Sequence, residues 1–151
     1  MADTVTQHII VGAGVSQVYQ AWANFENFPS FMHYIKQVTR RDDRLSHWVM
    51  EGPLGKKVEW DAETTRLEPN QRIAWSSKQN SPLKTSGQVT FIPLGQNETD
   101  ITVSMHYEPP AGWAGDVVAD LLGDPEGKLA ADLRNFKGFI EAVPERTNRP
   151  K

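Results

Sequence analysis

The sequence predicts an α+β domain in which a curved antiparallel sheet wraps around one long C-terminal helix. Three observations point to this fold class. The chain has 151 residues, which is enough for a single hydrophobic core. From about residue 36 to 108, apolar and polar residues alternate, as they do in strands with one buried face. A stretch with helical periodicity follows near the end, and a sheet with one dry face needs such a cover.

The first element is a strand over residues 4–11, TVTQHIIV, which is rich in β-branched side chains. Residues 12–14, Gly-Ala-Gly, end it. A short helix follows, with Ser16 as the expected N-cap. Its apolar residues fall on one face, at Val15, Val18, Tyr19 and Trp22.

The next segment, FENFPSFMHYIKQV (residues 25–38), is strongly aromatic. Its apolar residues again have helical spacing, at Phe28, Phe31, Met32 and Ile35. Pro29 suits the first turn of a helix, where its missing N–H is not needed. We therefore expect a second short helix here.

The alternating region contains a series of strands that are separated by turn residues such as Glu68-Pro69-Asn70 and Gly95-Gln96-Asn97. Short connections of this kind predict an antiparallel meander. The side chains predicted to face inward are Val58, Trp60, Ala62, Ile73, Trp75, Val89, Phe91, Ile101, Val103, Met105 and Tyr107. Trp48 and Met50 join them if the turn at residues 52–57 keeps the register.

Two helical stretches are expected after Pro109-Pro110. The first covers residues 113–122. The second begins at Asp124-Pro125-Glu126, a strong helix start, and reaches about Val143. Its apolar face consists of Leu129, Leu133, Phe136 and Ile140. We expect one domain over residues 1–143 and a flexible polar tail over 144–151.

The composition excludes several classes of function. The net charge of −3 argues against nucleic acid as the main partner, because phosphate binding needs a basic face. The chain has no cysteine, so disulfides and thiolate chemistry are excluded. The N-terminus does not resemble a signal peptide, and no apolar run has the length of a membrane span. We expect a cytoplasmic protein without a cofactor, for which transient membrane contact remains open.

Several segments together carry a resemblance to a known family. They are FENFPSFM, HWVMEGPLGKKVEWDAE, RIAWSS, SGQVTFIPLG, VSMHYEPPAG and DPEGKLAADLRNFKGFIE. In this order they resemble the START-like, helix-grip superfamily called SRPBCC. The likeness is to its branch of polyketide cyclases/dehydrases and coenzyme-Q-binding proteins. The resemblance implies a seven-stranded sheet, two short helices after the first strand, and an apolar cavity between the sheet and the terminal helix. The two short helices would cover its mouth.

The resemblance, combined with strand parity, gives a candidate ligand site. Phe28, Phe31 and Met32 would form a gate over the cavity. The remaining candidate ligand-binding residues are Trp48, Met50, Trp60, Trp75, Phe91, Met105, Tyr107, Leu133, Phe136 and Ile140. Large rings and thioethers make an adaptable apolar wall, which suits a lipid, a quinone or an aromatic polyketide. The alternative is that these side chains fill the core and leave no pocket.

The sequence offers few groups for catalysis. The candidates for acid–base work are Tyr107, His33 and Arg66, and no nucleophile–base pair is evident. Glu59, Asp61 and Glu63 alternate with apolar residues and are expected to face water. The four histidines lack the spacing of metal ligands, so no metal site is predicted.

The sequence therefore favours a carrier or chaperone that holds a small hydrophobic molecule in the cavity. A cyclase or dehydratase that uses acid–base groups in the same cavity is the second reading. The third is a protein-interaction module, whose contact surface would lie around residues 111–122.

Overall fold

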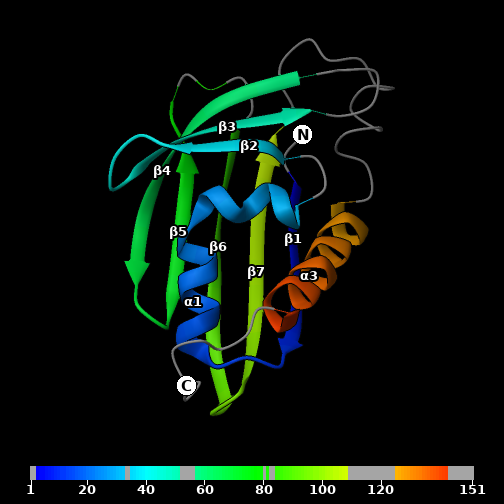
Figure 1. Cartoon of the computed structure of the whole chain (residues 1–151). Coiled ribbons are helices and arrows are strands. Elements are labelled where there is room, and N and C mark those ends of the chain that lie inside the picture. The colour runs from blue at the N-terminus through cyan, green and yellow to red at the C-terminus, as the bar shows by residue number, and fades with distance from the viewer. Residues whose placement is uncertain are drawn as a thin grey trace.

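A computed structural model describes residues 3–32, 35–51, 57–79, 81, 84–108 and 125–142, without the side chains of Asp3, Tyr107 and Pro125 (Figure 1). A seven-stranded antiparallel sheet curves around helices that lie on its concave side. This is the predicted helix-grip architecture. The expected helix at residues 113–122 and the expected tail at 144–151 lie outside the described residues.

The strands follow the predicted alternation closely. They are β1 (Asp3–Val11), β2 (Ile35–Arg40), β3 (Leu45–Glu51), β4 (Lys57–Glu68), β5 (Arg72–Ser77), β6 (Lys84–Gly95) and β7 (Glu98–Glu108). Their order in the sheet is β1-β7-β6-β5-β4-β3-β2, so β2 to β7 form a meander. Because β1 and β2 are the two edge strands, the chain between them must cross the concave face.

Two helices make that crossing. The first is α1 (Val15–Ala23), and the second is a short 3₁₀ helix, η1 (Phe25–Ser30). The predicted second helix is therefore tighter and earlier than expected. It ends at Ser30, and Ile35 begins strand β2 instead of continuing a helical face. Pro29 lies near the end of η1, where the N–H groups of Phe31 and Met32 both donate to the carbonyl of Phe28.

The start of α1 also differs from expectation. The N-cap is Gly14 rather than Ser16, and its carbonyl accepts a hydrogen bond from the Val18 N–H at 3.0 Å. A Cβ on Gly14 would lie 2.7 Å from the carbonyl oxygen of Gln96, in the hairpin between β6 and β7. Only glycine permits so close an approach, so the helix starts at this contact.

A bulge in β4 corrects one predicted site residue. Thr64 pairs with Trp75, but the next pair is Arg66 with Ala74, so Thr65 is an extra residue in β4. The extra residue reverses the parity of everything after it. Arg66 consequently lies on the outer face, where it forms an exposed ion pair with Glu68 at 3.0 Å. It does not reach the interior.

The turns have conventional chemistry. Asn70 follows Pro69 between β4 and β5 and has a φ of 62°, a value that asparagine tolerates better than most residues. Between β2 and β3, the Asp42 carboxylate accepts hydrogen bonds from the backbone N–H groups of Arg44 and Leu45, both at 2.8 Å. These two bonds, that from Arg44 first, lower the pKa of Asp42.

The long helix α3 (Pro125–Ala142) closes the concave side next to β1. Its predicted apolar face is confirmed, because Leu129, Leu133, Phe136 and Ile140 are all buried. Near the C-terminal end of α3, the Glu141 carboxylate accepts a hydrogen bond from the Gly12 backbone N–H at 2.6 Å. The same carboxylate oxygen accepts a hydrogen bond from Lys137 Nζ, also at 2.6 Å. The Glu141 carboxylate thus connects this end of the helix to the end of β1.

Candidate functional site

Aromatic rings from five elements meet on the concave side of the sheet. Trp22 of α1 contacts three of these rings, with ring centroids 5.4 Å from Phe28, 5.8 Å from Phe31 and 5.1 Å from Phe136. The whole set, which we call the aromatic cluster, consists of Trp22, Phe25, Phe28, Phe31, Trp48, Trp60, Phe136 and Phe139. Most contacts are edge-on or tilted, the geometries that aromatic pairs favour.

Local structure explains how the cluster forms. The spacing in α1 places Val18, Tyr19 and Trp22 on its buried face. The tight turn of η1 then returns the chain, so that Phe28 packs 5.3 Å from Phe31 and 5.2 Å from Trp48 of β3. The predicted gate is therefore a continuous part of the core: Phe28 and Phe31 are buried, and Met32 is half-buried.

The structure settles the register of Trp48 and Met50, which the sequence left open: both lie on the inner face, paired with Trp60 and Val58. Trp48 pairs with Trp60 across β3 and β4, and their rings stack with centroids 6.1 Å apart and planes 13° apart. The indole N–H of Trp48 donates to the hydroxyl of Ser46 at 2.8 Å, in buried surroundings. Ser46 thus supplies the partner that a buried indole N–H needs.

Trp22 differs from Trp48 in this respect. Its side chain is only 1% exposed, yet its Nε1–H has no hydrogen-bond partner in the described part of the chain. An unsatisfied buried donor costs about 1–3 kcal/mol. The sequence places Trp22 on the apolar face of a helix and gives no sign of this isolated donor.

Burial is incomplete on one row of the inner wall. Ile73, Val89 and Val103 form a cross-strand row that is almost completely buried. The next row, Trp75, Gly87 and Met105, has the same inward parity but is only half-buried. Phe91, another predicted contact, lies in the buried part, whereas Met50 is half-buried.

Gly87 is necessary for this row. A Cβ at position 87 would lie 2.7 Å from Cζ2 of Trp75 and 2.6 Å from the carbonyl oxygen of Ser104. The missing side chain leaves the space in which the Trp75 ring lies beside β6. A glycine in a strand interior often marks such a close approach.

The inner face offers little acid–base chemistry. Among the inward-facing strand residues whose side chains are described, none is Asp, Glu or His. The polar ones include Thr64, which is buried, and Ser77, whose hydroxyl accepts a hydrogen bond from the Thr85 N–H at 3.1 Å. Two of the predicted catalytic candidates, His33 and the side chain of Tyr107, lie outside the described residues.

One titratable group on α1 was not singled out from the sequence. Tyr19 packs edge-on against Phe91, with ring centroids 5.8 Å apart. Burial raises the pKa of its hydroxyl above the usual value, so Tyr19 stays protonated at neutral pH.

The charged groups of β3 and β4 lie on the outer face, as predicted for Glu59 and Asp61. His47 lies between them, with Nδ1 2.9 Å from Asp61 and Nε2 2.9 Å from Glu59. These hydrogen bonds, that to Asp61 first, raise the pKa of His47. No group of three or more His, Asp or Glu side chains suited to a metal ion occurs among the described residues.

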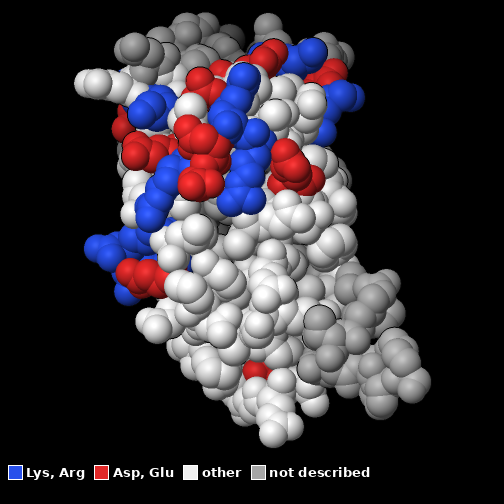
Figure 2. Space-filling model, turned by 60° about the vertical axis from the view of Figure 1, so that its left-hand side comes forward, with Lys and Arg blue, Asp and Glu red and all other residues white. Residues whose placement is uncertain are grey.

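Charges of both signs are interleaved on the surface shown in Figure 2. They gather over its upper part, while the lower part of this face carries few charged side chains. Because neither sign forms a continuous field there, this face offers no basic surface for a phosphate backbone. None of the described helices is both long and apolar enough to cross a membrane.

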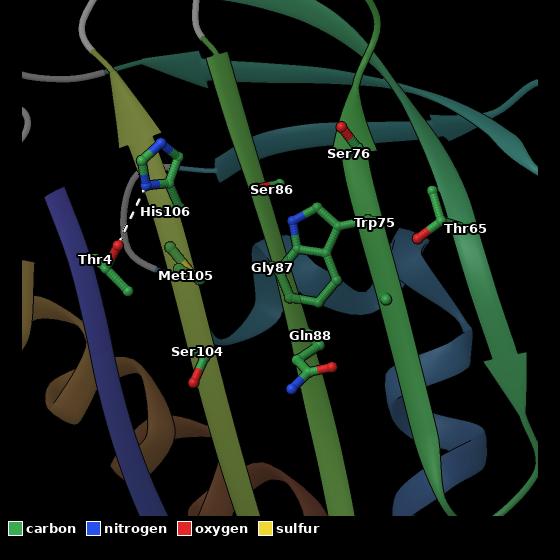
Figure 3. Close-up of a pocket in the computed structure, with 11 residues that line it drawn as sticks. Thr4, Thr65, Trp75, Ser76, Ser86, Gly87, Gln88, Ser104, Met105 and His106 are labelled. Carbon is green, nitrogen blue, oxygen red and sulfur yellow. Dashed lines mark hydrogen bonds between the residues drawn. The ribbon is translucent and has the colours of Figure 1, made fainter. Parts of the chain in front are cut away.

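The outer face of the sheet is hollowed opposite the half-buried row (Figure 3). This depression has a volume of about 380 Å³ and is lined by residues of β1 and β4 to β7. Polar residues such as Thr4, Ser104 and His106 line it together with the half-buried row of Trp75, Gly87 and Met105. Thr4 and His106 are joined across it by a 3.2 Å hydrogen bond, and Gln88 and Ser104 lie beside them. The row that contains Gly87 therefore separates this outer hollow from the interior.

Comparison with known proteins identifies the family. A family profile described as polyketide cyclase/dehydrase and lipid transport matches residues 11–136. The chain belongs to this family. It is thus a START-like, SRPBCC protein, as its sequence motifs indicated. Family and fold together point to a protein that binds a hydrophobic small molecule.

Two relatives match nearly the whole chain. An uncharacterised 17.2 kDa protein of Streptomyces lincolnensis is 34% identical over 143 residues, which cover 95% of this chain and 93% of the relative. The crystal structure of a Deinococcus radiodurans protein is 32% identical, with a TM-score of 0.75, over 93% of this chain and 98% of that one.

A more distant structure shares the fold alone. It is the Zhui aromatase/cyclase of Streptomyces sp. R1128, which is 18% identical with a TM-score of 0.70. The match covers 93% of this chain and 94% of the aromatase/cyclase.

Proposed function

We propose that this protein is a carrier or chaperone that holds a small hydrophobic molecule between the concave face of its sheet and α3. The observation that carries this proposal is the inner wall around Trp75, Gly87 and Met105. Its side chains are apolar and face inward, but they are less buried than the row beside them. Such a surface gains from contact with an apolar ligand.

The proposed site combines this row with the aromatic cluster. The expected contacts are the gate residues Phe28, Phe31 and Met32, the sheet residues Trp48, Met50, Trp60, Trp75, Phe91, Met105 and Tyr107, and the helix residues Leu133, Phe136 and Ile140. Apolar burial would supply the affinity, at about 25 cal/mol per Å² of surface removed from water. A ligand that buries 200 Å² more apolar surface would gain roughly 5 kcal/mol by this measure.

A carrier function is favoured over an enzymatic one because the described inner wall has few groups for acid–base catalysis. A cyclase or dehydratase needs groups that polarise a carbonyl and transfer protons. The inward strand residues with described side chains include no carboxylate or imidazole, and Arg66 faces outward. The likeness to an aromatase/cyclase extends to the fold, which hosts unrelated functions.

Native mass spectrometry of the freshly purified protein tests the proposal. The carrier function predicts a species heavier than the bare chain by one small molecule, which organic extraction removes and which can then be identified. The extracted protein should regain the same mass when the molecule is returned. A protein that carries no adduct from several bacterial hosts, and that takes up none from their lipid extracts, would contradict the proposal.

A further inference from the structure

We infer that the Nε1–H of Trp22 is a hydrogen-bond donor to the ligand, and that the ligand is an apolar molecule with a carbonyl-type acceptor oxygen. This inference rests on the proposed function and specifies its ligand class. It starts from the contrast between two buried tryptophans. Trp48 has a buried hydroxyl, that of Ser46, at 2.8 Å from its indole nitrogen. Trp22 has no such partner among the described residues.

The surroundings of Trp22 make an unpaired donor costly. Its ring packs against the three rings of Phe28, Phe31 and Phe136, none of which carries a hydrogen-bond acceptor. The faces of these rings offer only weak N–H···π contacts. Buried polar groups in folded proteins are nearly always satisfied, and an exception in a binding region calls for a partner.

The position of Trp22 suits this role. Its ring contacts Phe28 of η1 and Phe136 of α3, and it lies beside Phe31 of the predicted gate. A ligand that enters between α1, η1 and α3 would bring an acceptor oxygen to Nε1, the one polar atom of the Trp22 side chain. An indole nitrogen can only donate, so a hydroxyl hydrogen or an ammonium group would not satisfy it.

The chemistry of the inner wall narrows the ligand class further. The described inward strand residues carry no carboxylate to pair with a cation. A neutral, largely apolar molecule with a ring ketone or quinone carbonyl fits both the aromatic wall and the isolated donor. A pure hydrocarbon would fit the wall but would leave the donor unsatisfied.

Two matched probes test this inference by isothermal titration calorimetry. They are 2-methyl-1,4-naphthoquinone and 2-methylnaphthalene, which share a ring skeleton and differ in the two carbonyl oxygens. The native protein should bind the quinone about tenfold more tightly, as expected when a buried donor gains its partner. In Trp22→Phe this preference should disappear, because the ring is kept in part but the N–H is lost.

Trp48→Phe is the matched control. It also replaces a buried indole by a phenyl ring, but the N–H that it removes already has Ser46 as partner. Affinity for both probes can fall in this variant, while the quinone preference should be kept. Loss of the preference in Trp48→Phe to the same extent as in Trp22→Phe would overturn the inference.

A spectroscopic measurement decides the matter without any variant. The chain has five tryptophans, so an ¹H–¹⁵N correlation spectrum contains five indole signals. The quinone should shift the Trp22 signal downfield as its N–H becomes hydrogen-bonded, whereas 2-methylnaphthalene should not. If both probes bind equally and the Trp22 signal responds to them alike, the inference fails while the carrier function stands. If neither probe binds, the inferred ligand class is wrong, whereas the carrier function is decided separately by the native mass spectrometry described above.

Discussion

Phe31 provides the sharpest test of how the aromatic cluster supports the fold. Its ring contacts Trp22, Phe28, Phe136 and Phe139 at centroid distances of 4.9–5.8 Å, and the side chain is 2% exposed. Phe31→Ala would remove a ring that joins η1 to both α1 and α3. Replacing a buried phenylalanine by alanine costs about 3–5 kcal/mol.

This loss should be measurable by thermal unfolding. For a chain of this length, 1 kcal/mol corresponds to about 2–4 °C in Tm, so Phe31→Ala should lower Tm by roughly 6–20 °C. Circular dichroism of the ligand-free protein, together with urea unfolding, gives both Tm and the free energy of unfolding. Phe139→Ala is the control, because Phe139 belongs to the same cluster but is only partly buried. A fall of less than 2 °C for Phe31→Ala would refute the packing described for η1.

Three further substitutions test other contacts. Gly87→Ala places a Cβ 2.7 Å from Trp75, so we expect a loss of about 1–3 kcal/mol in urea unfolding and a changed Trp75 environment in near-UV circular dichroism; an unchanged stability would contradict the close approach. The pKa of His47 is raised in the fold, so its stabilising effect relative to His47→Gln should be complete below about pH 6.5 and should vanish as pH rises through the folded pKa. A difference in unfolding free energy that stays constant with pH would exclude this. The pKa of Glu141 is lowered, chiefly by Lys137 and then by the backbone N–H of Gly12, so Glu141→Gln should cost about 1 kcal/mol at neutral pH. That cost should shrink as pH falls below about 4.3, and a cost that grows on acidification would show the opposite linkage.

Much of the fold could be predicted from periodicity. Apolar and polar residues alternate along the strands with few interruptions. The helix-start residues Asp124-Pro125-Glu126 correctly predicted the helix that covers residues 125 to 142. The alternation and the helix start depend on short-range patterns, which a single sequence displays directly. The register of the strand that carries Trp48 was left open by the sequence, and the structure pairs Trp48 with Trp60.

Local irregularities could not be predicted in the same way. The bulge at Thr65 moved Arg66 to the outer face, and nothing in the residues around it signals an extra position in the ladder. The N-cap at Gly14 depends on the carbonyl of Gln96, a contact between residues more than 80 positions apart. Both errors arise from tertiary geometry, which overrides local preference.

The candidate site was predicted in composition but not in its polar detail. Apolar spacing indicated the rings of Phe28, Phe31 and Phe136, and all three are in the aromatic cluster. Whether the indole nitrogen of Trp22 or that of Trp48 has a partner depends on where Ser46 lies in space. No spacing rule connects these residues, so the isolated donor emerged only from the three-dimensional arrangement.

A hydrophobic molecule is proposed to bind on the concave side of the sheet, against the aromatic cluster. The most direct measurement is the set of intermolecular nuclear Overhauser effects between bound 2-methyl-1,4-naphthoquinone and isotope-labelled protein. We predict contacts from the probe to the rings of Phe28, Phe31 and Phe136. Contacts confined to Gln88 and Ser104 of the outer hollow would contradict the account.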